Sequence, residues 1–237
     1  MKNKIAASVM ALIFVSATAL AACGGGSDFD STASSPGIGS QGQGQGGSAP
    51  SSPTTASTLS DVEVSGLLFM REEEELARDL YLDIFEAKDA RLNTFKNISD
   101  NAETQHAEAI RVLLERYGID DPSTGARNTY NDPELQNLYN QLLNIAVGSD
   151  DLAALRVGAL VEETDIRDIN THKSRVSTEH QDIISTYDNL LCGSRNHLRA
   201  FVGQIEGLTG QVYQVQVPEL YDEVQAILNS SRERCGQ

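Results

Sequence analysis

Four long segments of the chain repeat apolar residues every three or four positions, and acidic or histidine side chains interrupt each of these apolar stripes. The segments cover about residues 61–88, 94–117, 149–171 and 179–205. Apolar residues at this spacing form one face of an α-helix that packs against other helices. Glu74 falls on the stripe of the first segment, where a buried carboxylate without a partner would be costly. The sequence therefore predicts a helical bundle with polar groups inside it.

The second and third segments place acidic residues on their apolar stripes. Glu103 and His106 form a Glu-x-x-His spacing, so they lie one helical turn apart and project from the same face. Glu162 and Asp165 lie on the stripe of the third segment, one turn apart, whereas Glu163 is expected to face solvent. Two neighbouring helices are thus expected to direct carboxylates and an imidazole toward one interior region.

The fourth segment has His197 on its stripe, with Ser194 one turn earlier. Gly193 lies inside this helix, where glycine costs about 1 kcal/mol relative to alanine, so it indicates a close approach or room for another group. In the first segment, residues 72–75 are four consecutive glutamates. All except Glu74 are expected on a solvated face.

Several shorter signals divide the chain into elements. Ser60-x-x-Glu63 is a capping box that predicts the start of the first helix, and Thr178-x-x-Gln181 predicts the start of the fourth. Ser149 is expected to cap the third. The remaining predicted elements are a short helix at about 133–145, a weakly alternating strand at 212–217 and a last helix at about 218–228.

The four stripes together resemble the ferritin-like superfamily, in which two helices each supply a glutamate and two others each supply Glu-x-x-His to a di-iron site. The resemblance implies an all-α, ferritin-like four-helix bundle with an extra short helix between helices 2 and 3 and a small C-terminal extension. It implies an iron or manganese site, dinuclear or with a single metal. The implied metal ligands are Glu74, Glu103, His106, Glu162, Asp165 and His197. Ser194 departs from the family pattern, because a hydroxyl stands where a glutamate is expected, and Asp165 is the candidate replacement.

Local motifs extend this resemblance. Residues 74–81 and 103–107 are similar to the first two ligand helices of rubrerythrins. The blocks 67–74, 115–122 and 193–201 resemble a ferritin-like family of exported microbial proteins, a domain of unknown function. The second resemblance implies the fold and no particular activity.

The N-terminus has the features of an export signal. Lys2 and Lys4 precede an apolar run that ends in Leu-Ala-Ala-Cys23, which resembles the lipobox of bacterial lipoproteins. The resemblance implies a signal peptide at 1–22, lipidation of Cys23 and anchoring in the bacterial cell envelope, with Gly24 favouring the outer membrane. After Cys23, residues up to 59 are rich in Gly, Ser and Gln and predict a flexible tether. Residues 60–237 then form the helical domain.

The net charge limits the kinds of molecule that the protein can bind, and the cysteines limit how its chain can be cross-linked. The chain has 34 acidic and 18 basic residues, a formal net charge of −16, which argues against nucleic acid as a partner. Of the three cysteines, Cys23 is the predicted lipidation site, which leaves Cys192 and Cys235. An exported compartment permits a disulfide between these two. The sequence leaves both the bridged and the unbridged state open, because it gives no geometry. His172 and His180 lie near predicted helix ends and are expected to be exposed.

Two functions are compatible with these features. The first is a membrane-tethered metalloprotein whose activity, if it has one, is that of a non-haem di-iron oxidoreductase. The alternative is a metal-free helical binding or structural envelope lipoprotein, which pairing of Arg195 or Arg199 with the inward carboxylates would favour. Metal storage or sensing without turnover lies between the two. The sequence assigns no catalytic residue or substrate, and it leaves a homodimer open.

Overall fold

The structure is a computed structural model that describes residues 58–236, and every regular element in this part of the chain is helical. The elements are α2 (Asp61–Ala87), α3 (Asn93–Ile98), the π-helical turn η1 (Ser99–Glu103), α4 (Thr104–Tyr117), α5 (Pro133–Val147), α6 (Asp151–Lys173), α7 (Gln181–Thr209), the 3-10 turn η2 (Pro218–Leu220) and α8 (Tyr221–Leu228). The predicted all-α bundle is therefore confirmed. The predicted signal peptide, Cys23 and the tether as far as residue 57 lie outside the described residues.

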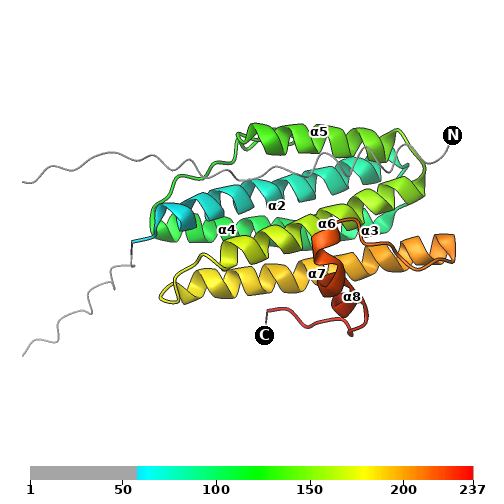
Figure 1. The fold of residues 1–237 in the computed structure, drawn as a ribbon. Helices are drawn as coiled ribbons and strands as arrows, with labels where there is room; N and C mark the ends of the chain where they lie inside the picture. The colour runs from blue at the N-terminus through cyan, green and yellow to red at the C-terminus, as the bar shows by residue number, and fades with distance from the viewer. Residues whose placement is uncertain (1–57, 237) are drawn as a thin grey trace, which may run out of the picture. The chain divides into compact units, whose positions relative to one another are not determined.

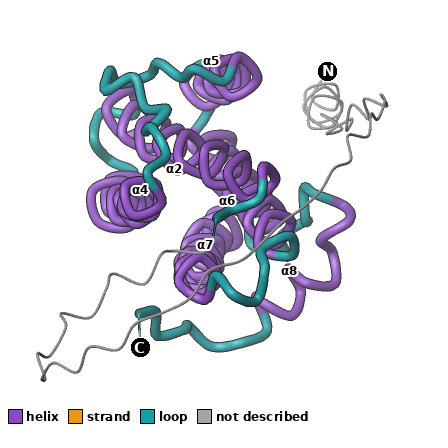
Figure 2. Tube along the Cα trace, turned by 90° about the vertical axis from the view of Figure 1, so that its left-hand side faces the viewer, coloured by secondary structure: helices purple, strands orange, loops and turns teal. Residues whose placement is uncertain are grey.

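Four helices, α2, α4, α6 and α7, lie side by side as a bundle (Figures 1 and 2). The short α3 reverses the chain, so α2 and α4 run antiparallel. The predicted short helix is α5, which runs back along the outside of the bundle beside α2. Because α5 returns the chain to the end where α4 began, α4 and α6 run in the same direction.

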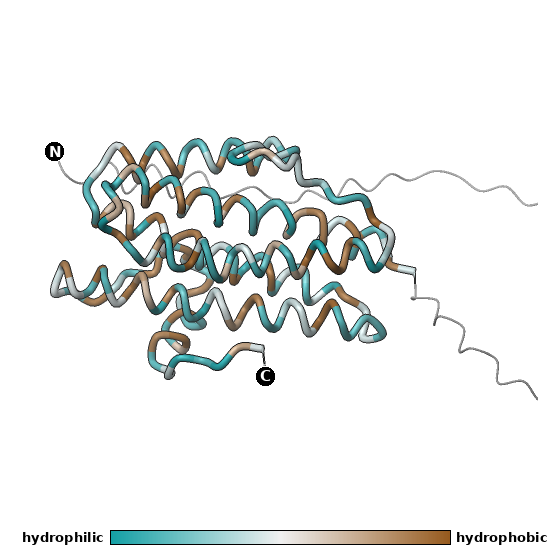
Figure 3. The backbone as a smooth tube through the Cα atoms, turned by 180° about the vertical axis from the view of Figure 1, so that it is seen from behind, coloured by the Kyte–Doolittle hydropathy of each residue, from teal (hydrophilic) through white to brown (hydrophobic). Residues whose placement is uncertain are grey.

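Each bundle helix has one apolar face. Apolar and polar segments alternate along every helix in Figure 3, as expected for helices that bury a single face. Tyr81, Phe95 and Phe201 form an aromatic cluster with ring centroids 4.9–5.5 Å apart. Gly158 is required beside this cluster, because a Cβ there would lie 2.5 Å from the ring of Phe201. None of the helices in the described part of the chain is both long and apolar enough to cross a membrane.

The helix starts follow the predicted signals in part. The capping box of α2 is confirmed: Ser60 accepts a hydrogen bond from the Glu63 amide, and the Glu63 carboxylate accepts one from the Ser60 amide at 2.8 Å. The start of α6 is one residue later than predicted, because Asp150 rather than Ser149 accepts the Ala153 amide. Both residue types cap helices well, so the sequence alone does not separate them.

The start of α7 was predicted wrongly. The helix begins at Gln181 after His180, which makes no side-chain capping bond, and Thr178 does not form the predicted capping box. The carboxylate of Glu63 instead accepts the Ser177 amide at 2.8 Å and lies 2.6 Å from Nδ1 of His180. His180 is therefore buried, contrary to the expectation that it is exposed.

The segment predicted as a strand, 212–217, has no regular structure. Its amide groups at Gln216 and Val217 donate to the carboxylate of Glu163 at 2.9 and 2.7 Å, and the Tyr213 hydroxyl donates to the same carboxylate at 2.9 Å. Glu163 is fully buried by these contacts, so the expectation that it faces solvent is wrong. This carboxylate supplies the acceptor that a neighbouring strand would otherwise have supplied.

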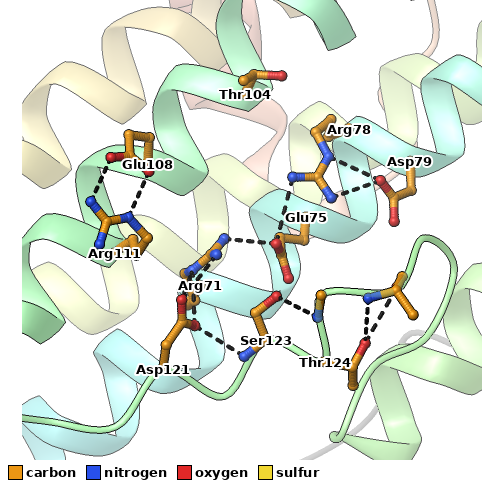
Figure 4. A network of polar contacts seen from close by, with 12 residues as sticks. Arg71, Glu75, Arg78, Asp79, Thr104, Glu108, Arg111, Asp121, Ser123 and Thr124 are labelled. Atoms are coloured by element: carbon orange, nitrogen blue, oxygen red, sulfur yellow. Dashed lines mark hydrogen bonds and ion pairs between the residues drawn. The ribbon is translucent and has the colours of Figure 1, made fainter.

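The four consecutive glutamates of α2 are all buried, which also corrects the prediction of a solvated face. The connection between α4 and α5 covers the helix at Glu72. Glu72 accepts the Asp132 amide of that connection at 3.0 Å. Figure 4 shows Arg71 between Glu75 of its own helix and Asp121 of the connection, at 3.0 and 3.1 Å. A loop that covers a helix needs partners for its own backbone and charged groups, and these glutamates and the arginine provide them.

Candidate metal centre

Five of the six predicted ligands come together at the centre of the bundle. Glu74 lies on α2, Glu103 ends the turn η1, His106 lies on α4, Glu162 on α6 and His197 on α7. The potential ligand atoms of Glu74, Glu103 and His106 lie within 4.8 Å of one another, and so do those of Glu103, Glu162 and His197. The site therefore consists of two triads that share one carboxylate, Glu103.

The shared carboxylate directs its two oxygens to different histidines. Oε2 of Glu103 lies 3.0 Å from Nδ1 of His106, and Oε1 lies 2.9 Å from Nδ1 of His197. Each histidine has a second carboxylate: Glu74 lies 3.2 Å from Nδ1 of His106, and Glu162 lies 3.4 Å from Nδ1 of His197. The two halves of the site thus have the same composition, one imidazole with one carboxylate of its own and one that is shared.

The side chains of the site differ in their exposure to solvent. The side chains of His106 and His197 are 12% and 11% exposed, whereas those of Glu74, Glu103 and Glu162 are 2% exposed or less. The two histidine side chains, on α4 and α7, are therefore the least buried members of the site.

A π-helical turn positions Glu103, and the sequence did not reveal it. In this turn the Thr104 amide donates to the carbonyl of Ser99, five residues earlier, and the Thr104 hydroxyl donates to the same carbonyl at 2.9 Å. The Ser99 hydroxyl donates to the carbonyl of Arg78 on α2 at 2.8 Å. Single π-turns within α-helices are frequent at functional sites. This turn depends on a contact with another helix, so a residue pattern within the segment does not identify it.

Gly193 leaves room for His106, which confirms the expectation of a close approach. A Cβ at Gly193 would lie 2.4 Å from Nε2 and 2.5 Å from Cε1 of His106. The backbone of α7 therefore lies against the outer edge of this imidazole, on the side opposite the carboxylates.

Tyr81 supports the second triad from α2. Its hydroxyl donates to Oε1 of Glu162 at 2.6 Å, and it is fully buried. Because Oε1 is occupied by this bond, Oε2 of Glu162 is the atom directed toward His197.

Asp165, the sixth predicted ligand, lies outside both triads. Its carboxylate accepts a hydrogen bond from the Ser194 hydroxyl, which also lies 2.9 Å from the carbonyl of Leu190. Oδ1 of Asp165 is buried and has no hydrogen-bond partner among the described residues. Asp165 and Ser194 therefore meet beside the site, on the helices that supply Glu162 and His197.

Burial and neighbouring charges raise the pKa of some groups of the site and lower the pKa of others. Burial raises the pKa of Glu74 to about 7, although the charge of His106 opposes this shift. Burial alone would raise the pKa of Glu103 too, but the charges of His197 and His106 outweigh it and lower that pKa. Burial would lower the pKa of His197, but Glu162 and Glu103 raise it to about 10. Glu103 is thus the carboxylate held most firmly in its charged form.

The donor set suits a divalent first-row metal ion. Carboxylate oxygens together with imidazole nitrogens are ligands for iron, manganese and zinc. Within the described part of the chain, Oε1 of Glu74 and Nδ1 of His197 are buried without a hydrogen-bond partner. Buried polar atoms of this kind need a compensating proton or cation, because their desolvation is costly. The residues present therefore fit a bound metal.

The other titratable residues singled out in the sequence do not join the site. His172 is half-buried against Gly66 and the ring of Phe69. Arg195 and Arg199 pair with Glu233 at 2.5 and 3.1 Å rather than with the inward carboxylates. The arginine pairing that would favour a metal-free protein is absent from the described residues.

The two remaining cysteines form a disulfide, which settles the question that the sequence left open. Cys192 on α7 is bonded to Cys235, with Cα atoms 5.6 Å apart. Cys192 directly precedes Gly193, so the bridge fixes the C-terminal segment to the turn of α7 that lies against His106.

Comparisons with known proteins agree with the predicted resemblance to a family of unknown function. Residues 63–231 match the family model described as "Uncharacterized protein domain (DUF2202)". The chain is 38% identical over 177 residues to the uncharacterized protein MJ0754 of Methanocaldococcus jannaschii. The aligned region covers 74% of this chain and 91% of that protein. The crystal structure of the hypothetical protein MJ0754 superposes with a TM-score of 0.66 at 35% identity, over 79% of this chain and 100% of that one. The chain therefore belongs to the DUF2202 family.

Proposed function

We propose that this protein is a ferritin-like metalloprotein that holds two divalent ions, iron or manganese, between the two triads. The observation that carries this proposal is the position of Glu103, whose two carboxylate oxygens lie 3.0 and 2.9 Å from two different imidazole nitrogens. A carboxylate placed in this way is suited to bridge two metal ions.

The course of the chain supports the ferritin-like assignment. Ferritin-like bundles have one long crossover connection, and α5 with its flanking loops is such a connection between α4 and α6. Inward glutamates on α2 and α6 and the Glu-x-x-His of the second bundle helix match the ligand pattern. Ser194 remains the departure from that pattern, and Asp165, the candidate replacement, lies outside both triads and accepts the hydrogen bond of the Ser194 hydroxyl.

Each side chain of the two triads would have a defined role at such a centre. Glu74 and His106 would hold one ion, Glu162 and His197 the other, and Glu103 both. Tyr81 would keep Glu162 in place through its 2.6 Å hydrogen bond. When bound, iron or manganese would supply redox chemistry, such as reduction of peroxide or dioxygen. The partly exposed histidine side, between α4 and α7, would admit these small molecules.

We also propose that the protein is anchored to the bacterial cell envelope by lipid at Cys23. The motif Leu-Ala-Ala-Cys23 after a basic and apolar start supports this anchoring, and the Gly-, Ser- and Gln-rich stretch would act as the tether. Labelling of the full-length protein with a fatty acid tests this anchoring. The Cys23→Ala variant should not be labelled.

The metal is tested by elemental analysis of the full-length protein after loading with Fe²⁺ or Mn²⁺ in the absence of oxygen. We expect about two ions per chain, as in two-metal sites, and about half of that amount or less in His106→Ala and His197→Ala. His172→Ala is the matched control, because His172 lies outside both triads, and it should bind as much metal as the unaltered protein. Equal metal content in all four proteins would contradict the proposal.

The alternative is a metal-free envelope lipoprotein, and one observation favours it. The Nδ1 atoms of both histidines already face carboxylates, so protonated imidazoles could neutralise part of the cluster. This alternative would be supported over the metalloprotein if the protein takes up no metal and has the same unfolding temperature with and without added metal.

A further inference from the structure

An apolar groove lies along α4, and none of the five residues of the triads lines it. It has a volume of about 440 Å³, and most of its lining is apolar. Gln105, Ala109, Val112 and Arg116 line it from α4, and Thr186 lines it from α7. The four α4 positions are spaced alternately by four and three residues, which is typical of a helix face that packs against a second helix.

The shorter helices of the described part of the chain pack on the other bundle helices. α5 packs on α2 and α6, and α8 packs on α7, whereas α4 contacts mainly α2, α7 and the turn η1. Figure 2 shows α4 at a corner of the bundle, on the side away from α8. Val112, near the middle of the groove, is 39% exposed. The groove is thus an apolar helix face that no further helix among residues 58–236 covers.

The charge of α4 indicates which partner the groove suits. The whole chain has a formal net charge of −16, so two copies of it repel each other over most of their surfaces. On α4, apart from His106 of the site, two glutamates, Glu108 and Glu115, are balanced by two arginines, Arg111 and Arg116. A second copy of the chain can therefore approach this helix without the repulsion that it meets elsewhere.

The charges of the groove are also arranged for pairing between two copies. Glu108 and Arg116 lie four residues before and after Val112, about 6 Å to either side of it along the helix axis. Both line the groove, and their side chains are 56% and 53% exposed. Their present ion pairs, with Arg111 and Asp182, lie at the surface, where such pairs contribute little. If two α4 helices pack antiparallel about a two-fold axis at Val112, Glu108 of each copy meets Arg116 of the other, as a self-complementary interface requires.

We propose that the groove on α4 is the interface of a homodimer, in which the α4 helices of two copies pack antiparallel about a two-fold axis at Val112. The two Val112 side chains meet at the axis, and an ion pair between Glu108 and Arg116 forms on each side of it. This inference does not depend on the proposed metal centre. A single helix of 14 residues offers a small contact area, so the dimer belongs to the weak class of interfaces. The proposed lipid anchor would raise the local concentration of copies at the membrane and favour such a dimer.

Cross-linking of the full-length protein in detergent tests the position of the axis. Val112→Cys should form a disulfide-linked dimer under mild oxidation, because a residue on a two-fold axis meets its own copy. Val62→Cys is the matched control, since Val62 is 50% exposed but lies on α2 and does not line the groove, and it should stay monomeric. The unaltered protein should give no cross-linked dimer under the same oxidant. No cross-linking of Val112→Cys, or equal cross-linking of both variants, overturns the proposal.

Sedimentation equilibrium of the same full-length protein over a range of concentrations tests the ion pairs. Glu108→Arg should weaken dimerisation about tenfold or more, because it places like charges opposite each other on both sides of the axis. The double variant Glu108→Arg/Arg116→Glu restores opposite charges and should dimerise as the unaltered protein does. Glu115→Arg is the control, because it makes the same change of charge on α4 outside the groove, and it should not weaken the dimer. The proposal is refuted if the unaltered protein is monomeric at every concentration, if the double variant is as weak as Glu108→Arg, or if Glu115→Arg weakens the dimer equally.

Discussion

Oε1 of Glu103 lies 2.9 Å from Nδ1 of His197, a residue that is 94 positions away and lies on the last helix of the bundle. The other oxygen of the same carboxylate lies 3.0 Å from His106, one turn along its own helical segment. Glu103 therefore joins a local Glu-x-x-His pair to a distant histidine. Removal of this one carboxylate should affect both halves of the site, whereas removal of Glu74 should affect only one.

The first prediction compares these two carboxylates. Glu103→Gln should leave the protein with almost no bound iron or manganese, because a neutral amide is a poor substitute for a bridging carboxylate. Glu74→Gln should retain the ion held by Glu162 and His197. Elemental analysis after identical loading measures the difference. The shared role of Glu103 is wrong if both variants keep the same amount of metal.

The second prediction concerns the contact between α7 and His106. Gly193→Ala should lower the free energy of unfolding by about 1–3 kcal/mol, because the new Cβ would displace the imidazole and overpacking costs this much. Helix propensity alone predicts the opposite sign, a gain of about 1 kcal/mol. Gly203→Ala on the same helix is the control, since no atom of residues 58–236 lies within 4 Å of a Cβ there, and it should be stabilising. Urea unfolding of both variants measures the effect, and equal changes in the two would show that the His106 contact is unimportant.

Much of the fold could be predicted because apolar stripes and helix-breaking residues are local signals. The five residues of the triads lay on predicted inward faces, and the structure brings them together. Asp165 lay on such a face too, but its carboxylate turns to Ser194 instead. A stripe specifies the face of a helix, whereas the partner of a given side chain depends on packing between helices.

Several of the glutamates that were assigned wrongly are buried by parts of the chain outside their own helix. Glu72, Glu73, Glu75 and Glu163 lie beside inward positions and were expected in solvent, yet chain connections and neighbouring helices cover them. Loops outside regular structure must find acceptors for their amides, and buried carboxylates of Glu72 and Glu163 supply them. Nothing in the local pattern indicates which exposed face a distant loop will cover. The π-turn before His106 was missed for a similar reason, because its Ser99 hydroxyl bonds to another helix.

The third prediction concerns the disulfide. Cys192 and Cys235 are 43 positions apart, and a bridge that closes a loop of this length should contribute about 2–4 kcal/mol to the free energy of unfolding. Dithiothreitol should therefore lower the urea midpoint of the unaltered protein. The double variant Cys192→Ala/Cys235→Ala should have the lower midpoint already and should not respond to the reductant. A response of the double variant equal to that of the unaltered protein would contradict the prediction.

The last prediction is a pH dependence that arises from Glu63, in the first turn of α2 and outside both triads. Burial alone would raise the pKa of Glu63, but hydrogen bonds from the Ser177 amide, the Ser60 hydroxyl and amide, and His180 outweigh it and lower the pKa from 4.5 to about 2. A carboxylate whose pKa is lower in the folded state binds fewer protons there than in the unfolded chain. Its stabilising contribution is therefore complete above about pH 4.5 and is lost as the pH falls toward 2.

Urea unfolding of the metal-free protein at several pH values between 2 and 7 measures this contribution. Glu63→Gln should be less stable than the unaltered protein at neutral pH, and the difference should shrink as the pH falls through this window, because the unaltered protein loses its charged carboxylate there. Glu134→Gln, a change at an exposed glutamate of α5, is the control and should follow the unaltered protein. A difference between Glu63→Gln and the unaltered protein that is constant with pH would mean that packing, rather than the charge of Glu63, joins the start of α2 to the loop before α7.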